Sequence, residues 1–174
     1  MMANEKHMNT RLIAFAGIGA ALVFVATYSV RIPLPATEGY LNLGDAVILL
    51  LSYILGPLAF FPAAVGSALG DLVAGYAQYI IPTFIIKGSM ALFAGLVLKK
   101  VSGSNISLIR RILAFTGAEL IMVGGYFLFE SLPFMYGPAA AALSVPFNLI
   151  QGAAGILVAV PVSYVKAFGR FRES

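Results

Sequence analysis

DLVAGYAQYIIPTFIIKG, residues Asp71–Gly88, decides the fold class of this chain because it places a lysine inside a run of apolar residues. The stretch begins with a carboxylate, crosses a short polar turn and enters an apolar segment that contains Lys87. An ammonium at the centre of a membrane helix costs ~3 kcal/mol on insertion scales. Lys87 therefore needs an anionic partner, a water-filled cavity or a ligand, and we expect it to line a small-molecule pocket that opens to the outside of a membrane.

The composition predicts an all-α integral membrane protein. The chain has 174 residues, of which 60% are hydrophobic and only 10% are charged, and its mean hydropathy is +0.95. Soluble domains are typically about 25% charged, so this sequence could not cover a water-exposed surface. Six spans of ~20–25 residues would use most of the length. We therefore expect a single six-helix membrane domain over residues 1–174.

The residue types present exclude several kinds of chemistry. There is no cysteine, which excludes disulfides, thiolate metal sites and a cysteine nucleophile. The one histidine, His7, lies in the polar N-terminal segment and so is unsuited to catalysis within the membrane. The sequence has no Walker A loop, so any dependence on ATP must come from a partner. We expect no catalytic residue, no metal and no cofactor.

Apolar runs and their breaks predict the spans. The breaks are Pro33 and Pro35 after the first run, and a tight Gly56-Pro57 turn after the second. The predicted spans are residues 11–30, 44–55, 58–74, 79–98, 112–129 and 139–168. The connection between the first two, Arg31–Leu43, is long, and we expect an irregular segment that acts as a lid over the pocket.

The basic residues predict that both termini are cytoplasmic. With six spans and the N-terminus inside, nine of the eleven basic residues fall on the inner side: Lys6, Arg11, Lys99, Lys100, Arg110, Arg111, Lys166, Arg170 and Arg172. Arg31 alone lies outside, and Lys87 lies within a span. This is a strong positive-inside bias. We expect Asp45 at the outer end of the second span, as a charge at a helix N-terminus.

Three later spans each carry a polar group at a similar depth. From a rise of 1.5 Å per residue, Lys87 lies about 12 Å from the outer end of its span, Glu119 about 15 Å and Asn148 about 14 Å. Gln151 follows Asn148 by three residues and shares its helix face. These four residues together predict a binding site for a small polar molecule. The alternatives are a structural Lys87–Glu119 ion pair and interhelical hydrogen bonds made by the two amides.

Tyrosines are the candidate walls of this site. Most of the tyrosines map to the outer half of the predicted spans, whereas an interfacial aromatic belt would populate both halves. A belt and a pocket wall both remain open as explanations. If they form a wall, their rings suit a flat heteroaromatic ligand by stacking. The candidates are Tyr40, Tyr76, Tyr79 and Tyr126.

At this point the sequence resembles a known family. The segment Asn42–Leu72, NLGDAVILLLSYILGPLAFFPAAVGSALGDL, and the small residues Ala16 and Ala20 in the first span resemble the substrate-binding S components of energy-coupling factor (ECF) vitamin transporters. The resemblance implies a vitamin ligand bound toward the outside. It also implies that Ala16 and Ala20 face a transmembrane coupling subunit, and that two ATPase subunits supply energy.

Within that family the chain looks most like the group that handles hydroxymethylpyrimidine or pyridoxine, which implies uptake of such a compound across a bacterial cell membrane. An S component for another vitamin, such as riboflavin, is one alternative. A solitary transporter or an accessory membrane bundle is another, although solitary transporters often show internal repeats and none is evident. A membrane-embedded enzyme would need a metal cluster or a nucleophile–base set, and the sequence shows neither motif.

Overall fold

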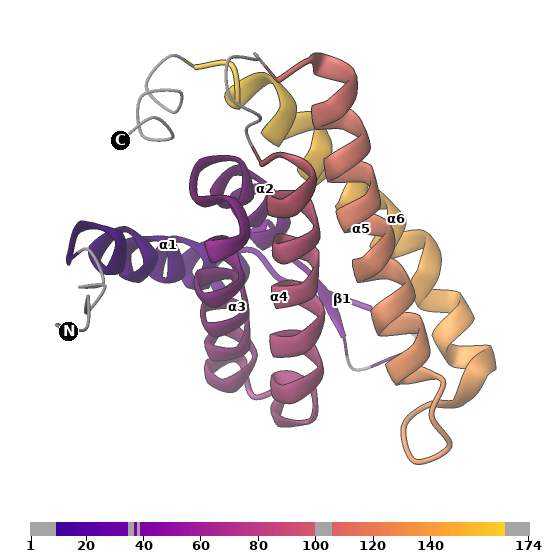
Figure 1. Cartoon of the computed structure of the whole chain (residues 1–174). Helices are drawn as coiled ribbons and strands as arrows, with labels where there is room; N and C mark the ends of the chain where they lie inside the picture. The colour runs from indigo at the N-terminus through magenta and orange to yellow at the C-terminus, as the bar shows by residue number, and fades with distance from the viewer. Residues whose placement is uncertain (1–9, 35–36, 38, 100–105, 166–174) are drawn as a thin grey trace, which may run out of the picture.

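The computed structural model describes residues 10–34, 37, 39–99 and 106–165, and most of them are helical (Figure 1). The fold class expected from the composition, all-α, is confirmed for this part of the chain. The elements are α1 (Thr10–Ser29), β1 (Ile32–Pro33), β2 (Tyr40–Leu41), α2 (Gly44–Leu55), the 3-10 turn η1 (Gly56–Ala59), α3 (Phe60–Ala74), the 3-10 turn η2 (Ala77–Tyr79), α4 (Ile80–Val97), α5 (Leu108–Glu130) and α6 (Gly137–Val162).

Several of these helices could cross a membrane. Four stretches of the described chain are long and apolar enough to do so: Gly44–Ala74, Ala77–Val97, Leu108–Glu130 and Gly137–Val162. A shorter apolar helix covers Ile13–Ser29. The chain is therefore a multi-pass helical membrane protein. Residues 166–168 of the last predicted span lie outside the described residues.

The first of those stretches contains two helices, because the chain reverses direction at Gly56. This glycine has a φ of 59°, a left-handed value that costs glycine little, and Pro57 follows it. Leu51 of α2 and Pro62 of α3 both lie within 3.3 Å of the place that a Cβ on Gly19 would occupy. Because these two residues are at similar distances along the chain from Gly56, α2 and α3 lie antiparallel.

The helices pack in an order that places α2 at the centre. Helices α3, α4, α5 and α6 each pack against the next in sequence, and α1 packs against α3 (Figure 1). Helix α2 is central because it contacts α1, α4 and α6. Side chains near the start of α2 can therefore meet side chains from several helices at once.

Two glycines let α1 approach α3 closely. A Cβ on Gly66 would lie 2.5 Å from the carbonyl oxygen of Ala20, and a Cβ on Gly70 would lie 2.7 Å from the side chain of Thr27. Small residues four apart on one helix permit this kind of contact in membranes. The two contacts follow the same order along both helices, so α1 and α3 run parallel.

The connection between α1 and α2 forms a short β-hairpin, where we expected irregular structure. Strand β1 pairs antiparallel with β2, and Pro33 lies opposite Tyr40. Inside the hairpin, the backbone N–H of Leu34 donates a hydrogen bond of 2.9 Å to the carbonyl oxygen of Gly39. Residues 35, 36 and 38 of the predicted lid lie outside the described residues.

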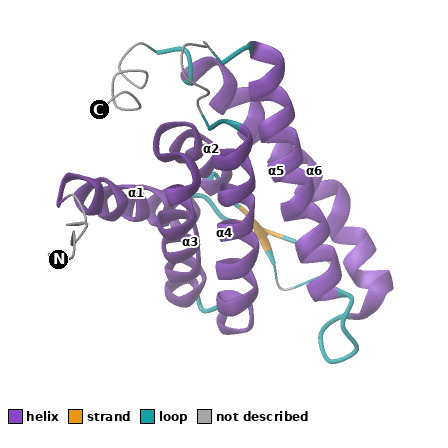
Figure 2. Ribbon diagram, viewed as in Figure 1, coloured by secondary structure: helices purple, strands orange, loops and turns teal. Residues whose placement is uncertain are grey.

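This hairpin leads into α2, a helix that is too short to cross the membrane by itself. Twelve residues of α-helix span about 18 Å, whereas the hydrocarbon core is ~30 Å thick. The second residue of α2, Asp45, forms an ion pair with Lys87, the eighth residue of α4. The start of α2 is therefore deep in the bundle rather than at its outer end, which corrects our placement of Asp45. Strand β2 contacts α6, and Figure 2 shows the two strands among the helices.

Arg111, near the start of α5, contacts residues at the ends of α2 and α6. Its Nη1 donates hydrogen bonds to the Ser163 carbonyl oxygen at 2.7 Å and to the Ser163 hydroxyl at 2.6 Å, and Ser163 caps the C-terminus of α6. The guanidinium carbon also lies 4.6 Å from the ring centre of Tyr53 and 4.0 Å from that of Tyr164. Cation–π contacts and a favourable helix dipole both stabilise this arrangement.

Candidate ligand-binding site

A cleft lies beside the hairpin, between the helices that surround it. It holds about 360 Å³ of space, part of which is open to solvent. Non-helical backbone at membrane depth is tolerated where protein buries it or where it lines a cavity, so the position of the hairpin itself favours a binding site here. We call it the hairpin cleft, and its described lining is Leu34, Gly39, Tyr40, Asn42, Asp71, Tyr79, Thr83, Tyr126, Glu130, Asn148 and Gln151.

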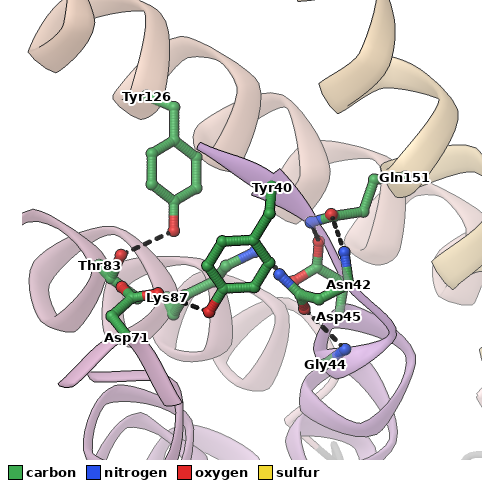
Figure 3. A network of polar contacts seen from close by, with 9 residues as sticks. All are labelled: Tyr40, Asn42, Gly44, Asp45, Asp71, Thr83, Lys87, Tyr126 and Gln151. Carbon is green, nitrogen blue, oxygen red and sulfur yellow. Dashed lines mark hydrogen bonds and ion pairs between the residues drawn. The ribbon is translucent and has the colours of Figure 1, made fainter. Parts of the chain in front are cut away.

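Tyr40 connects the hairpin to α3 across this cleft. Its hydroxyl donates a hydrogen bond of 2.7 Å to Oδ1 of Asp71 (Figure 3). Its ring centre lies 4.7 Å from that of Tyr76, with the planes tilted by 40°. Burial, together with the nearby Asp71 carboxyl, raises the pKa of the Tyr40 phenol above its usual range, so the phenol stays protonated and remains a donor.

A second carboxyl group in the cleft, that of Glu130, is held by hydroxyl groups. Tyr79 donates to its Oε1 at 3.0 Å and Ser144 donates to its Oε2 at 2.5 Å. Close by, the hydroxyls of Thr83 and Tyr126 share a hydrogen bond of 3.0 Å. These contacts join η2, α4, α5 and α6, so the rings of Tyr79 and Tyr126 are held in fixed positions along the cleft wall.

A polar network behind the cleft joins α2, α4 and α6 to the end of the hairpin. Lys87 forms an ion pair with Oδ1 of Asp45, and Nε2 of Gln151 donates to the other oxygen, Oδ2, at 2.5 Å (Figure 3). The backbone N–H of Asn42 in turn donates to Oε1 of Gln151 at 2.7 Å. The amide of Gln151 thus links the hairpin to a buried ion pair. Gln151 therefore makes an interhelical hydrogen bond, which was one of the two alternatives for this residue.

Lys87 has a different partner from the one considered in the sequence analysis. It is 2% exposed and pairs with Asp45 instead of Glu119. Glu119 is 4% exposed, and neither of its carboxyl oxygens accepts a hydrogen bond from a described residue. The oxygens lie against Gly152 and Gly155 of α6. Glu119 lines a separate, mostly apolar cavity between α5 and α6 and does not line the hairpin cleft, so its expected place beside the other site residues is not observed. The alternative of a structural Lys87–Glu119 ion pair is wrong.

The structure brings together most of the other candidate residues. Five of them line the hairpin cleft, namely Tyr40, Tyr79, Tyr126, Asn148 and Gln151. Tyr76 is not part of the lining but its ring packs against that of Tyr40, and Lys87 lies behind the cleft, 5.4 Å from the ring centre of Tyr126. On α1, Ala16 and Ala20 are half-buried, whereas their neighbours Gly17 and Ala21 are exposed.

Sequence reasoning missed several lining residues, above all Asp71 and Glu130. Asp71 was given no role beyond its place at the start of the stretch Asp71–Gly88, and Glu130 was given none. A signal was present for Asp71, because it lies near the end of a predicted span, close in sequence to Tyr76 and Tyr79. Glu130 is likewise the last residue of a long apolar helix. A carboxylate at the pocket end of a membrane helix is a candidate for ligand contact.

The electrostatics of the cleft favour a ligand with donors. Among the described lining residues, Asp71 and Glu130 carry carboxyl groups and none carries a basic side chain. No group of three His, Cys, Asp or Glu residues that could hold a metal ion occurs in the described part of the chain. The arrangement is suited to reversible binding of a small polar ring through hydrogen bonds and stacking.

Comparison with known proteins finds a matching family model and several relatives. The family model for the ECF-type riboflavin transporter S component matches residues 7–167. Thiamine precursor transporter HmpT of Lactococcus lactis subsp. cremoris is 31% identical over 157 residues, which cover 89% of this chain and 87% of that protein. An uncharacterized protein of Pyrococcus woesei is 34% identical over 144 residues, covering 82% of this chain and 93% of that protein.

A more distant relation covers about half of the chain. A protein named UPF0397 from Lactococcus lactis subsp. cremoris is 33% identical over 99 residues, which cover 56% of this chain and 53% of that protein. The family match extends over α1 to α6, so it includes every element that contributes to the hairpin cleft.

Proposed function

The chain belongs to the family of ECF-type riboflavin transporter S components, and from that premise we propose that it binds a thiamine precursor of the hydroxymethylpyrimidine type for uptake. S components are transporter subunits and not enzymes, and the family implies a vitamin ligand and an ECF module as partner. The observation that supports this substrate class is the hairpin cleft, together with the similarity to a thiamine precursor transporter over 89% of the chain. Pyridoxine, a ring of similar size, is included in the proposal.

The binding site in this proposal is the hairpin cleft. Asn148 and Gln151 of α6 would hydrogen-bond the ligand, and the rings of Tyr40, Tyr79 and Tyr126 would form its walls. Lys87 would not touch the ligand. It would hold Asp45 in place, and Asp45 in turn would orient the side-chain amide of Gln151. The short hairpin would be the lid that separates a bound ligand from water.

We further propose six spans with both termini in the cytoplasm. The reversal at Gly56 supports counting α2 and α3 as two passes, and the parallel packing of α1 along α3 supports α1 as a third. With this topology Arg110 and Arg111 lie on the inner side, as the positive-inside rule requires. The cleft then opens outward. The cell membrane of a bacterium is the proposed location, in keeping with the lactococcal relative.

The partner would be a transmembrane coupling subunit with two ATPase subunits. We propose that α1 meets the coupling subunit through its small residues, Ala16 and Ala20. Both are half-buried in this chain, and small side chains there would let a helix of another subunit approach closely. The chain carries no Walker A loop, so ATP hydrolysis would be the partner's contribution.

Riboflavin is the second candidate ligand, because the matching family model is described by that vitamin. The similarity to a thiamine precursor transporter over 89% of the chain favours the one-ring precursor instead. Titration calorimetry of the purified full-length chain with hydroxymethylpyrimidine, pyridoxine and riboflavin tests the assignment. Tight binding of riboflavin with no binding of the one-ring compounds would overturn the proposed substrate class.

A further inference from the structure

One carboxyl oxygen in the wall of the hairpin cleft has no hydrogen-bond partner among the described residues. Asp71 is 4% exposed, and the Tyr40 hydroxyl donates to its Oδ1. Its Oδ2 is buried and accepts no hydrogen bond from the described chain. Buried polar atoms are hydrogen-bonded in the great majority of cases, so an exception in a cleft wall marks a position for a donor on a ligand.

The neighbours of Asp71 leave Oδ2 without a donor at hydrogen-bonding distance. Tyr40 donates to Oδ1, and the Thr83 hydroxyl, which is close to Asp71, shares a hydrogen bond with Tyr126 in which either hydroxyl can be the donor (Figure 3). The Lys87 ammonium pairs with Asp45. No described side chain therefore donates to Oδ2, which lies at a fixed place in the wall.

The charge of the cleft points to the same kind of ligand. Two carboxyl groups, those of Asp71 and Glu130, line it without a basic residue among the described lining. Buried carboxylates are favourable only when a cation or several donors accompany them. The tyrosine rings at the wall add a surface on which a flat ring can stack.

We propose that Oδ2 of Asp71 accepts a hydrogen bond from an amino group on the ligand, so that the cleft selects a heteroaromatic ring that carries an amine. The inference rests on the proposed function and narrows it. A hydroxymethylpyrimidine with a ring amino group belongs to this class, whereas pyridoxine, which carries hydroxyl groups and no amine, does not. Asp71 is thereby a residue that determines specificity within the one-ring ligands.

The test compares two probes on the full-length wild-type chain in detergent by titration calorimetry. One probe is the hydroxymethylpyrimidine that bears a ring amino group, and the other is the same compound with a methyl group in place of the amino group. A hydrogen bond to a charged acceptor is lost in the second probe, so its affinity should be about 10- to 150-fold weaker. This comparison requires no variant and therefore no assumption about folding.

Two variants then assign the preference to Asp71. Asp71→Leu keeps the branched shape of the side chain but removes the acceptor, so the two probes should bind it with nearly equal affinity. Glu119→Gln, a change of a buried carboxyl outside the hairpin cleft, should keep the wild-type preference. Equal wild-type affinity for the two probes, or an undiminished preference in Asp71→Leu, overturns the role of Asp71 and leaves the proposed function intact. If the wild-type chain binds neither probe, both the substrate class and this assignment are wrong.

Discussion

Replacing Lys87 with methionine is expected to destabilise the fold, because the change leaves the buried Asp45 carboxylate without its cation. Asp45 is 1% exposed, and its remaining described partner is the side-chain amide of Gln151. Removing one member of a buried ion pair costs about 3–5 kcal/mol. A domain of this length shifts its melting temperature by ~2–4 °C per kcal/mol, so we expect a loss of roughly 6–20 °C.

A second substitution identifies the partner. Lys87→Met combined with Asp45→Asn removes both charges and keeps an amide that can bond to Gln151, so most of the lost stability should return. Lys87→Met combined with Glu119→Gln is the matched control, because it also neutralises a buried carboxyl group, and it should bring little recovery. The melting temperatures of the purified variants in one detergent are measured by far-ultraviolet circular dichroism, because the chain has no tryptophan whose fluorescence could report unfolding.

The opposite pattern would refute the reasoning. Recovery with Glu119→Gln but not with Asp45→Asn would mean that Lys87 and Glu119 are the functional pair. Additive losses in the Lys87→Met, Asp45→Asn double variant would mean that the two side chains do not interact energetically, since coupled neighbours give non-additive effects.

Three further predictions concern the partner face, the lid and the amides. Ala16→Trp or Ala20→Trp should abolish uptake by the assembled transporter while ligand binding to the isolated chain survives; equal loss of both would indicate damaged folding. Saturating ligand should slow hydrogen exchange in residues 31–43, and unchanged exchange would exclude a lid. Asn148→Ala or Gln151→Ala should weaken ligand binding roughly 5- to 150-fold in calorimetry, and unaltered affinity would remove that amide from the site.

The need of Lys87 for a partner could be predicted from sequence, but the partner could not. Counting residues from the ends of predicted spans placed Lys87 and Glu119 at one depth, and depth says nothing about which helix face a side chain occupies. Asp45 was placed at the outer end because its span begins there. In the structure the hairpin precedes α2 among the helices, so Asp45 begins a helix inside the bundle and reaches Lys87.

The part of the candidate site that depends on residue type and spacing along one helix could be predicted. Asn148 and Gln151 share a helix face by their spacing of three, and both line the cleft. Asp71 escaped notice because its role depends on Tyr40, a residue 31 positions earlier that reaches it only when the hairpin folds between the helices. Contacts of that range depend on tertiary packing, which local periodicity does not encode.

The hydrogen bond between the Asn42 backbone and Gln151 bears on how long a ligand stays bound. It ties the hairpin to a side chain that also holds the buried ion pair, so the hairpin cannot swing open without disturbing the floor of the cleft. If the hairpin is the lid, as we propose, departure of a ligand requires these bonds to break together, and we expect the dissociation rate to be low. Differences in affinity generally arise from such dissociation rates. A long residence suits a subunit that meets its cargo rarely in dilute surroundings and must keep it until slower motions of the membrane assembly deliver it.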